Sequence, residues 1–203
     1  PIDMSAWIDD CAAVVEAWYP GEQGARAVTE ILFGDINPSG KLPITFPKSV
    51  GQLPLFYSAK PSGRGKGYIE NDGSPLYPFG YGLSYTEFKY SGLVLSSPQM
   101  KKGKTIQATV TVTNTGNRTG EEVVQLYIRD LIGSVTRPVK LLKGFQKISL
   151  APGETMNISF TIDEEMLSFW RHDMTFGTEE GDFKVMVGSS SSDLLQASFS
   201  LVP

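Results

Sequence analysis

The sequence contains few of the side chains from which most catalytic and metal sites are built. It has one cysteine, Cys11, and one histidine, His172, among 203 residues. A lone cysteine forms no internal disulfide, so the cysteine count does not indicate whether the protein resides in an oxidising or a reducing compartment. We interpret Cys11 as a small buried side chain. A lone histidine builds neither a His-based catalytic triad nor a multi-histidine metal site. We therefore expect no metal and no cofactor.

A basic excess and a long apolar run are also missing. The net charge is −4 and the pI is about 5.1, so no stripe of Lys and Arg can neutralise phosphates, and we expect no nucleic-acid partner. No run of about 18 apolar residues occurs, so we expect no membrane span. The chain opens on Pro1 without a start methionine or a signal peptide, and we expect a fragment of a longer protein.

What the sequence does contain is an aromatic stretch, PLYPFGYGLSY at residues 75–85, in which rings alternate with Gly and Pro. Proline fixes φ and glycine permits positive φ, so the stretch is typical of a shaped connector and not of a helix or a central strand. A flexible linker would be rich in Ser and Gly and short of aromatics. Because its rings have large areas to bury, we expect this connector to pack against the domain that follows it.

Residues 1–46 are typical of the tail of an α/β domain. The apolar run at 12–19 is predicted to be a buried strand, although periodicity alone does not separate it from a helix. Apolar residues at helical spacing predict a helix over 24–33, with Gly34 as its C-terminal stop. Residues 41–47 are predicted to be extended at a sheet edge, which completes a βαβ remnant.

A parallel sheet needs cover on both faces, and a unit this small lacks it. We therefore expect the apolar sides of Val14, Val15, Ile31 and Leu32 to be exposed and to support self-association.

Residues 47–87 are predicted to form a loop followed by the connector. The loop contains GRGKG at 63–67, and a phosphate-binding loop of this kind should follow a strand and open a helix. Here the glycines run into YIENDG, so we interpret the segment as a basic surface loop, with the rim of a ligand site as its functional alternative.

From residue 88 onward, short alternating segments are separated by turn signals. The predicted strands are 93–95, 105–113, 122–128, 139–150, 155–162, 183–187 and 197–202. The predicted fold class is therefore mainly β: an immunoglobulin- or fibronectin type III-like antiparallel β-sandwich over 88–203, preceded by the βαβ remnant of an α/β domain.

Acidic residues are the remaining candidates for catalysis, and many stand in adjacent pairs: Asp9-Asp10, Glu121-Glu122, Glu164-Glu165 and Glu179-Glu180. Catalytic carboxylates face each other across a substrate, whereas neighbours on a strand point to opposite faces. We therefore interpret each pair as solvated surface and assign no catalytic residue to this chain.

Seven motifs resemble glycoside hydrolase family 3 and follow the family's order over essentially the whole chain. Two resemble the end of its second domain, one its domain junction and four its fibronectin type III-like domain. They are WYPGEQG at 18–24, LFGDINPSGKLP at 32–43, PLYPFGYGLSY at 75–85, VTVTNTG at 110–116, VQLYI at 124–128, LKGF at 142–145 and LAPGE at 150–154. The likeness is closest to bacterial periplasmic β-glucosidases, in which a second glycine usually stands at the position of Ala25.

The resemblance implies the C-terminal part of a retaining, exo-acting β-glucosidase that hydrolyses terminal β-glucosides and is periplasmic or secreted. In the family the Asp nucleophile lies on an N-terminal barrel and the Glu acid/base usually lies earlier in the α/β domain. Neither motif occurs here, so the chain alone is expected to be inactive. The partners implied are that barrel, the rest of the α/β domain and a β-glucoside oligosaccharide.

Three residues of the loop, Tyr57, Arg64 and Tyr68, are the candidates for the rim of the active site. An aromatic ring can stack on a sugar, and Arg can bond its hydroxyl groups. An ordinary surface loop is the alternative.

Two roles for the sandwich stay open. A carbohydrate-binding module would display a row of exposed aromatics, but Tyr127, Phe145, Phe160 and Phe183 fall at positions that we predict to face inward. A structural and interaction domain would support the catalytic domains, which the aromatic connector favours.

Overall fold

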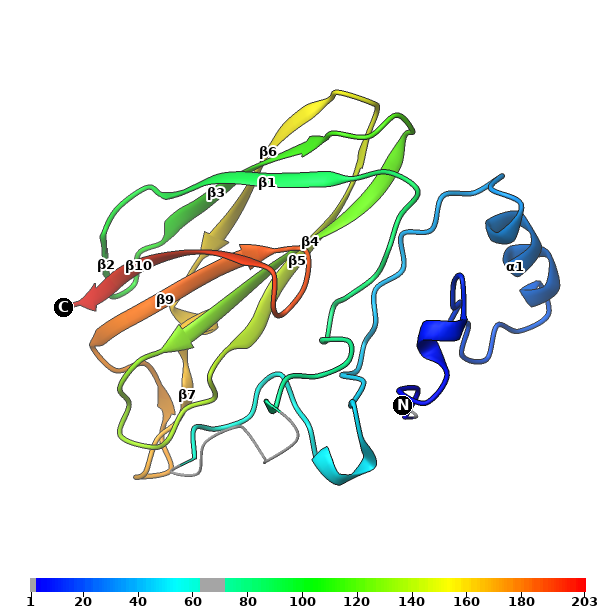
Figure 1. Ribbon diagram of the computed structural model, residues 1–203. Coiled ribbons are helices and arrows are strands. Elements are labelled where there is room, and N and C mark those ends of the chain that lie inside the picture. The colour runs from blue at the N-terminus through cyan, green and yellow to red at the C-terminus, as the bar shows by residue number, and fades with distance from the viewer. Residues whose placement is uncertain (1–2, 63–71) are drawn as a thin grey trace.

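The computed structural model describes residues 3–62 and 72–203, and most of its regular structure is β-strand (Figure 1). The mainly β fold class is thereby confirmed. The helical elements are η1 (Ile8–Asp10), α1 (Gly24–Leu32), η2 (Val50–Gln52) and α2 (Glu164–Leu167). The strands are β1 (Phe88–Leu95), β2 (Gln99–Lys101), β3 (Ile106–Asn114), β4 (Gly120–Asp130), β5 (Leu141–Leu150), β6 (Thr155–Ile162), β7 (Phe169–Trp170), β8 (Phe176–Gly177), β9 (Gly181–Gly188) and β10 (Leu194–Val202).

The strands form a sandwich of two sheets. One sheet has the order β1-β3-β6 and the other the order β2-β10-β9-β4-β5, while β7 and β8 pair with each other as a separate hairpin. The described strand pairs are antiparallel except that of β10 with β2, which is parallel, so the sandwich is not wholly antiparallel as expected. The chain changes sheets between β1 and β2, so β2 lies beside the C-terminal strand and not beside its sequence neighbour.

The core lies between the two sheets, where the period-two alternation predicted it. Every second residue of β3 is buried there: Ile106, Ala108, Val110 and Val112. The facing strand β4 contributes Val124, Leu126 and Ile128 to the same cluster. One face of each sheet is thus apolar because alternate side chains point to opposite sides of a strand.

The βαβ remnant is only partly as predicted. Helix α1 lies where we expect it, and Gly34, with φ of +80°, follows its end. Residues 12–19 are irregular and mostly exposed, so the prediction of a buried strand there is wrong. A strand requires a hydrogen-bonded neighbour, and the described part of the chain provides none for these residues.

The other two predictions for residues 1–47 concern the burial of Cys11 and the extended segment at 41–47. The prediction that Cys11 is buried is wrong: it is exposed, as are the residues on either side of it. Residues 41–47 are extended but carry a single β-bridge, between Phe46 and Tyr77.

None of the helices in the described residues is long and apolar enough to cross a membrane.

Candidate functional site

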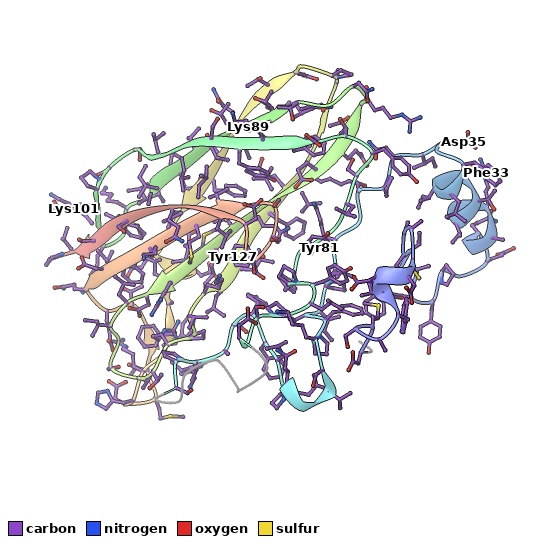
Figure 2. The ribbon with its side chains drawn as sticks, viewed as in Figure 1. Phe33, Asp35, Tyr81, Lys89, Lys101 and Tyr127 are labelled. Atoms are coloured by element: carbon purple, nitrogen blue, oxygen red, sulfur yellow. The ribbon has the colours of Figure 1, made fainter. Side chains whose placement is uncertain are left out.

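The N-terminal segment is joined to the sandwich along the connector. The Leu42 N–H donates to the Tyr81 carbonyl at 2.8 Å, and the Gly80 N–H donates to the Leu42 carbonyl at 2.8 Å. Farther along, the Phe46 N–H donates to the Tyr77 carbonyl at 2.9 Å. The two extended segments therefore lie side by side, with Tyr81 between the sandwich and the N-terminal segment (Figure 2).

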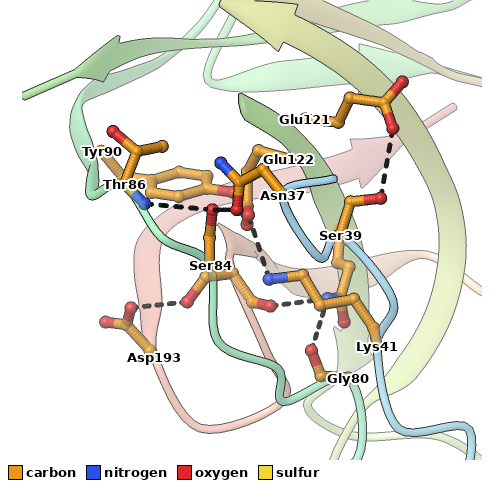
Figure 3. A network of polar contacts seen from close by, with 12 residues as sticks. Asn37, Ser39, Lys41, Gly80, Ser84, Thr86, Tyr90, Glu121, Glu122 and Asp193 are labelled. Atoms are coloured by element: carbon orange, nitrogen blue, oxygen red, sulfur yellow. Dashed lines mark hydrogen bonds and ion pairs between the residues drawn. The ribbon is translucent and has the colours of Figure 1, made fainter. Parts of the chain in front are cut away.

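A buried ion pair crosses this junction. Lys41 Nζ lies 3.0 Å from Glu122 Oε2, and the two side chains are 14% and 4% exposed (Figure 3). The second carboxylate oxygen, Oε1, accepts a hydrogen bond of 2.9 Å from the Tyr90 hydroxyl. Burial and the neighbouring charge of Glu122 raise the pKa of Tyr90, which therefore remains a neutral donor.

The prediction that Glu122 is solvated is wrong. Glu122 shares the inward-facing side of β4 with Val124 and is 3% exposed. A buried carboxylate requires a charge partner and hydrogen bonds, and Lys41 and Tyr90 supply both. The sequence holds no pairing signal for these groups because they come from three separate segments.

Asn37 fastens the same segment by a second set of bonds. Its Nδ2 donates to the Thr119 carbonyl at 3.0 Å, on the sandwich. Its Oδ1 accepts from the Ser84 hydroxyl at 2.9 Å and from the Tyr85 N–H at 2.7 Å, on the connector. One amide side chain therefore holds the N-terminal segment, the connector and the start of β4 together.

Gly80 is the point where the connector comes closest to the sheet. Gln125, on the outer face of β4, donates through Nε2 to the Gly80 carbonyl at 3.0 Å and to the Ser189 carbonyl at 2.6 Å. The Tyr127 hydroxyl donates to Gln125 Oε1 at 2.5 Å. Gly80 has φ of +80°, and a Cβ placed on it would lie 2.0 Å from Gln125 Oε1, so only glycine fits.

Tyr57 lies beside the connector and is partly buried. Its ring stacks on Phe79 with centroids 4.3 Å apart, and it meets the edge of Tyr127 at 5.8 Å. Its hydroxyl accepts a bond of 3.4 Å from the Leu142 N–H. One face of the ring is therefore occupied by Phe79, and the role of Tyr57 at the rim stays a prediction.

Arg64 and Tyr68, the other rim candidates, lie outside the described residues. Asp72, which follows the segment that contains them, is bound by earlier and later residues. Lys48 Nζ lies 3.0 Å from Asp72 Oδ1. The same oxygen accepts from the Ser74 N–H at 2.9 Å and from the Ser74 hydroxyl at 2.7 Å. These bonds, chiefly those from Ser74, lower the pKa of Asp72 to about 2.

The inward-facing aromatics are only partly as predicted. Phe160 and Phe183 belong to the sandwich core, whereas Tyr127 and Phe145 lie on the outer face of the five-stranded sheet. Phe145 pairs with Gln125 and is 65% exposed, while Tyr127 is buried beneath Tyr57. The connector and its loop thus bury a patch of outer sheet that a solitary sandwich would expose.

Several of the acidic side chains from the predicted surface pairs bind neighbouring groups in the structure. Glu121 binds Lys147 at 2.7 Å and Glu180 binds Lys102 at 2.8 Å, both on the surface. Glu179 accepts from the Ser134 N–H at 2.7 Å. In the part of the chain that the structure describes, no cluster of three metal-ligating side chains occurs.

Asp130 is the described carboxyl group whose environment resembles that of a catalytic acid, because burial raises its pKa. However, the Arg137 Nε lies 3.6 Å from its Oδ2. The cavity beside them has a volume of about 10 Å³, far below the size of a sugar ring. Asp130 is therefore a structural group.

An apolar surface lies on the N-terminal part. Val14, Val15 and Leu32 are exposed, as predicted, whereas Ile31 is partly buried; Trp18 and Phe33 are exposed as well. Figure 1 shows helix α1 to one side of the sandwich. Side chains of this kind are normally covered, so this surface is suited to a contact with another part of a larger protein.

Two family models match the chain. The Glycosyl hydrolase family 3 C-terminal domain matches residues 1–85, and the Fibronectin type III-like domain matches residues 122–191. The chain is 48% identical to a periplasmic β-glucosidase of Salmonella typhimurium over 94% of its own length and 26% of that protein. It is 43% identical to a β-xylosidase of Formosa agariphila over 94% of its length and 27% of that protein.

The chain is also similar to the C-terminal parts of solved β-glucosidase structures. The crystal structure of a Listeria innocua β-glucosidase in complex with glucose matches with a TM-score of 0.94 and 33% identity, over 100% of this chain and 30% of that one. A mutant of the enzyme in complex with laminaribiose matches with a TM-score of 0.92 and 34% identity, over 100% of this chain and 29% of that one. The chain thus spans about a quarter of the length of the relatives it matches.

Proposed function

Because the chain belongs to glycosyl hydrolase family 3 and corresponds to the C-terminal part of its members, we propose that it supports the catalytic domains of a retaining, exo-acting β-glucosidase. The observation that carries this proposal is the match over 94% of the chain to a β-glucosidase, at 48% identity. The fused junction adds physical support. The Lys41–Glu122 pair, Asn37 and Gly80 bind the α/β tail to the sandwich as one unit on which further domains can rest.

In this proposal the chain supplies support and no catalytic group. Retaining hydrolysis requires a nucleophilic carboxylate about 5–5.5 Å from a second carboxyl group that acts as acid and base. Among the described carboxylates, Asp130 lies beside Arg137, Glu121 binds Lys147 and Glu179 accepts from the Ser134 N–H. As the family resemblance implies, the proposal assigns the nucleophile to an N-terminal barrel and the acid/base to the earlier part of the α/β domain.

Those missing parts are the proposed partners of the apolar surface around Trp18 and Phe33. Residues 12–19 would gain strand neighbours when the rest of the sheet is present, which would cover Val14 and Val15. Without that cover, the same surface would drive self-association of the isolated chain.

Tyr57, Arg64 and Tyr68 remain the proposed rim of the active site, with a β-glucoside oligosaccharide as the ligand. The stacking of Tyr57 on Phe79 supports a division of labour in which Tyr57 fixes the loop and Arg64 and Tyr68 contact the sugar. A location in the periplasm or outside the cell goes with the proposal, supported by the periplasmic relative.

A β-xyloside is the second candidate substrate, because a β-xylosidase is 43% identical to the chain. The test is a chimera in which this chain replaces the matching C-terminal part of the Salmonella enzyme. We expect it to fold and hydrolyse an aryl β-glucoside, whereas a folded chimera without β-glucosidase activity would contradict the supporting role. The substrate of this chain's own parent is then decided by assaying the protein encoded by the complete reading frame on aryl β-glucoside and aryl β-xyloside.

A further inference from the structure

One charged side chain, that of Glu16, stands in the middle of the apolar run at residues 12–19. The residue is exposed, and its Oε1 accepts a hydrogen bond of 2.9 Å from the Trp18 N–H. Val14 and Val15, which precede it, are exposed as well, and so is Trp18. Glu16 is therefore solvated in this chain, and it needs another partner wherever the run around it is covered.

The strand proposed above for residues 12–19 places Glu16 on an apolar face. Side chains alternate between the two faces of a strand, so Val14, Glu16 and Trp18 would share one face. Val15 would lie on the other. Because a parallel sheet is covered on both faces, the part of the protein that covers Val14 and Trp18 also covers Glu16.

The basic side chains of the N-terminal segment are all bound elsewhere. Residues 1–48 contain three of them, and each lies against a carboxylate: Arg26 Nε is 2.7 Å from Glu30, Lys41 Nζ is 3.0 Å from Glu122, and Lys48 Nζ is 3.0 Å from Asp72. The segment thus offers Glu16 no cation that is not already paired.

The run lies against the stretch of chain that the two lysines bound. The rings of Trp18 and Phe46 have centroids 6.3 Å apart. Lys41 is only 14% exposed in its ion pair, and Lys48 donates a second hydrogen bond to a serine hydroxyl. Moving either lysine to Glu16 would break these contacts, so a cation for Glu16 has to come from outside the segment.

We propose that Glu16 is an interface residue, and that the part of the larger protein that covers residues 12–19 pairs a Lys or Arg side chain with it. Charge complementarity supports a basic partner, because residues 1–25 contain no Lys, Arg or His but five carboxylates: Asp3, Asp9, Asp10, Glu16 and Glu22. The inference rests on the proposed function, because it takes the covering part from a larger family 3 protein, whose relatives this chain matches over about a quarter of their length.

A neutral donor suits Glu16 less well than a cation. A buried carboxylate requires a charge partner and hydrogen bonds, and Glu122 obtains both in this same chain from Lys41 and Tyr90. Hydroxyl and amide groups supply hydrogen bonds that are roughly half as strong as charge-assisted ones. They also leave the negative charge of the segment without an opposite charge, which a Lys or Arg provides.

The first test is thermal unfolding of the complete parent protein, beside this chain alone. In the parent, Glu16→Gln leaves the covering cation without its charge partner and should lower the unfolding midpoint by about 5 °C or more, and Glu16→Lys should lower it further. Glu22→Gln is the matched control, the same substitution in the turn after the run, and should shift the midpoint by less than about 1 °C. In the isolated chain, where Glu16 is exposed, all three variants should unfold within about 1 °C of the wild type. A parent in which Glu16→Gln and Glu22→Gln have equal effects overturns the proposal.

The second test identifies the partner. A crystal structure of the complete parent should place a Lys or Arg nitrogen within about 4 Å of a Glu16 carboxylate oxygen. A Glu16 that is solvated there, or bound by hydroxyl and N–H donors alone, overturns the proposal. Exchanging the two charges, with Glu16→Lys and a glutamate in place of the basic residue, should recover most of the midpoint lost by Glu16→Lys alone.

Activity separates this inference from the proposed function. A parent that hydrolyses an aryl β-glucoside while its Glu16→Gln variant keeps the wild-type midpoint overturns the ion pair alone. A parent that hydrolyses no β-glucoside but loses stability on Glu16→Gln supports the ion pair and contradicts the glucosidase assignment.

Discussion

Lys41 and Glu122, which are 81 residues apart in the chain, form an ion pair with Nζ 3.0 Å from Oε2. The pair joins a segment of the α/β tail to the inner face of the sandwich at β4, and the Tyr90 hydroxyl completes the shell of the carboxylate. Together with the bonds of Asn37 and Gly80, this ion pair fixes the relative position of the two parts of the chain.

Breaking this pair from one side should be costly. Lys41→Met leaves Glu122 buried without its charge partner, so we expect a loss of about 3 kcal/mol in the free energy of unfolding. Lys147→Met removes the partner of exposed Glu121 and should cost less than about 1 kcal/mol. Chemical denaturation of both variants measures the difference, and equal losses would show that the Lys41 pair is not buried in solution.

Gly80→Ala tests the close approach of the connector to Gln125. The added Cβ would displace Gln125, which also holds Ser189 and Tyr127, so we expect a loss of roughly 2–3 kcal/mol. Gly153→Ala is the control, because Gly153 has φ of +75° with nothing within 4 Å of an added Cβ. It should cost only the positive-φ penalty of about 1–2 kcal/mol. Thermal unfolding with both variants losing the same stability would contradict the contact.

Tyr57→Ala distinguishes anchorage from sugar contact. Loss of the stack on Phe79 and of the edge contact with Tyr127 should destabilise the fold by about 3 kcal/mol. Tyr57→Phe keeps the ring and loses only the long bond to the Leu142 N–H, so it should cost less than about 1 kcal/mol. If Tyr57→Ala unfolds like the wild type, Tyr57 is not an anchor.

The lowered pKa of Asp72 gives a prediction for acid pH. Its folded-state value of about 2 lies below the ordinary value of 3.8, so its contribution to stability is complete above about pH 4 and is lost as the pH falls towards 2. Ser74→Ala should raise the pKa of Asp72 more than Lys48→Met does, because the Ser74 bonds are the larger cause. Carboxyl NMR titration measures both values, and an Asp72 pKa near 3.8 in the wild type would contradict the bonding.

Much of the sandwich could be predicted because alternation along a strand is a local property. Ile106 to Val112 alternate in the sequence and alternate in the structure. The same alternation along β4 places Gln125 and Tyr127 on the outer face of the sheet, because Val124 points to the inner face. Tyr127 is nevertheless buried, because the distant Tyr57 covers it, and no local pattern reports that cover.

The failures concern contacts between distant segments. The composition of residues 12–19 permits a strand, since most of them are apolar and two are β-branched. A strand also needs a neighbouring strand to pair with, and the described chain provides none for them. Glu122 looks like half of a surface pair, and only the fold brings Lys41 and Tyr90 to it. The β7–β8 hairpin depends on a two-residue strand pairing that is too short for periodicity to identify.

The proposed role of this chain is to support the catalytic domains while supplying none of the reacting carboxylates. The most direct measurement is turnover of an aryl β-glucoside by the purified chain, beside the same chain combined with the N-terminal three quarters of the Salmonella relative. We expect no turnover by the chain alone and turnover only when the N-terminal part is present. Hydrolysis by the isolated chain that disappears on replacing one of its own carboxylates, such as Asp130→Asn or Glu179→Gln, would contradict it.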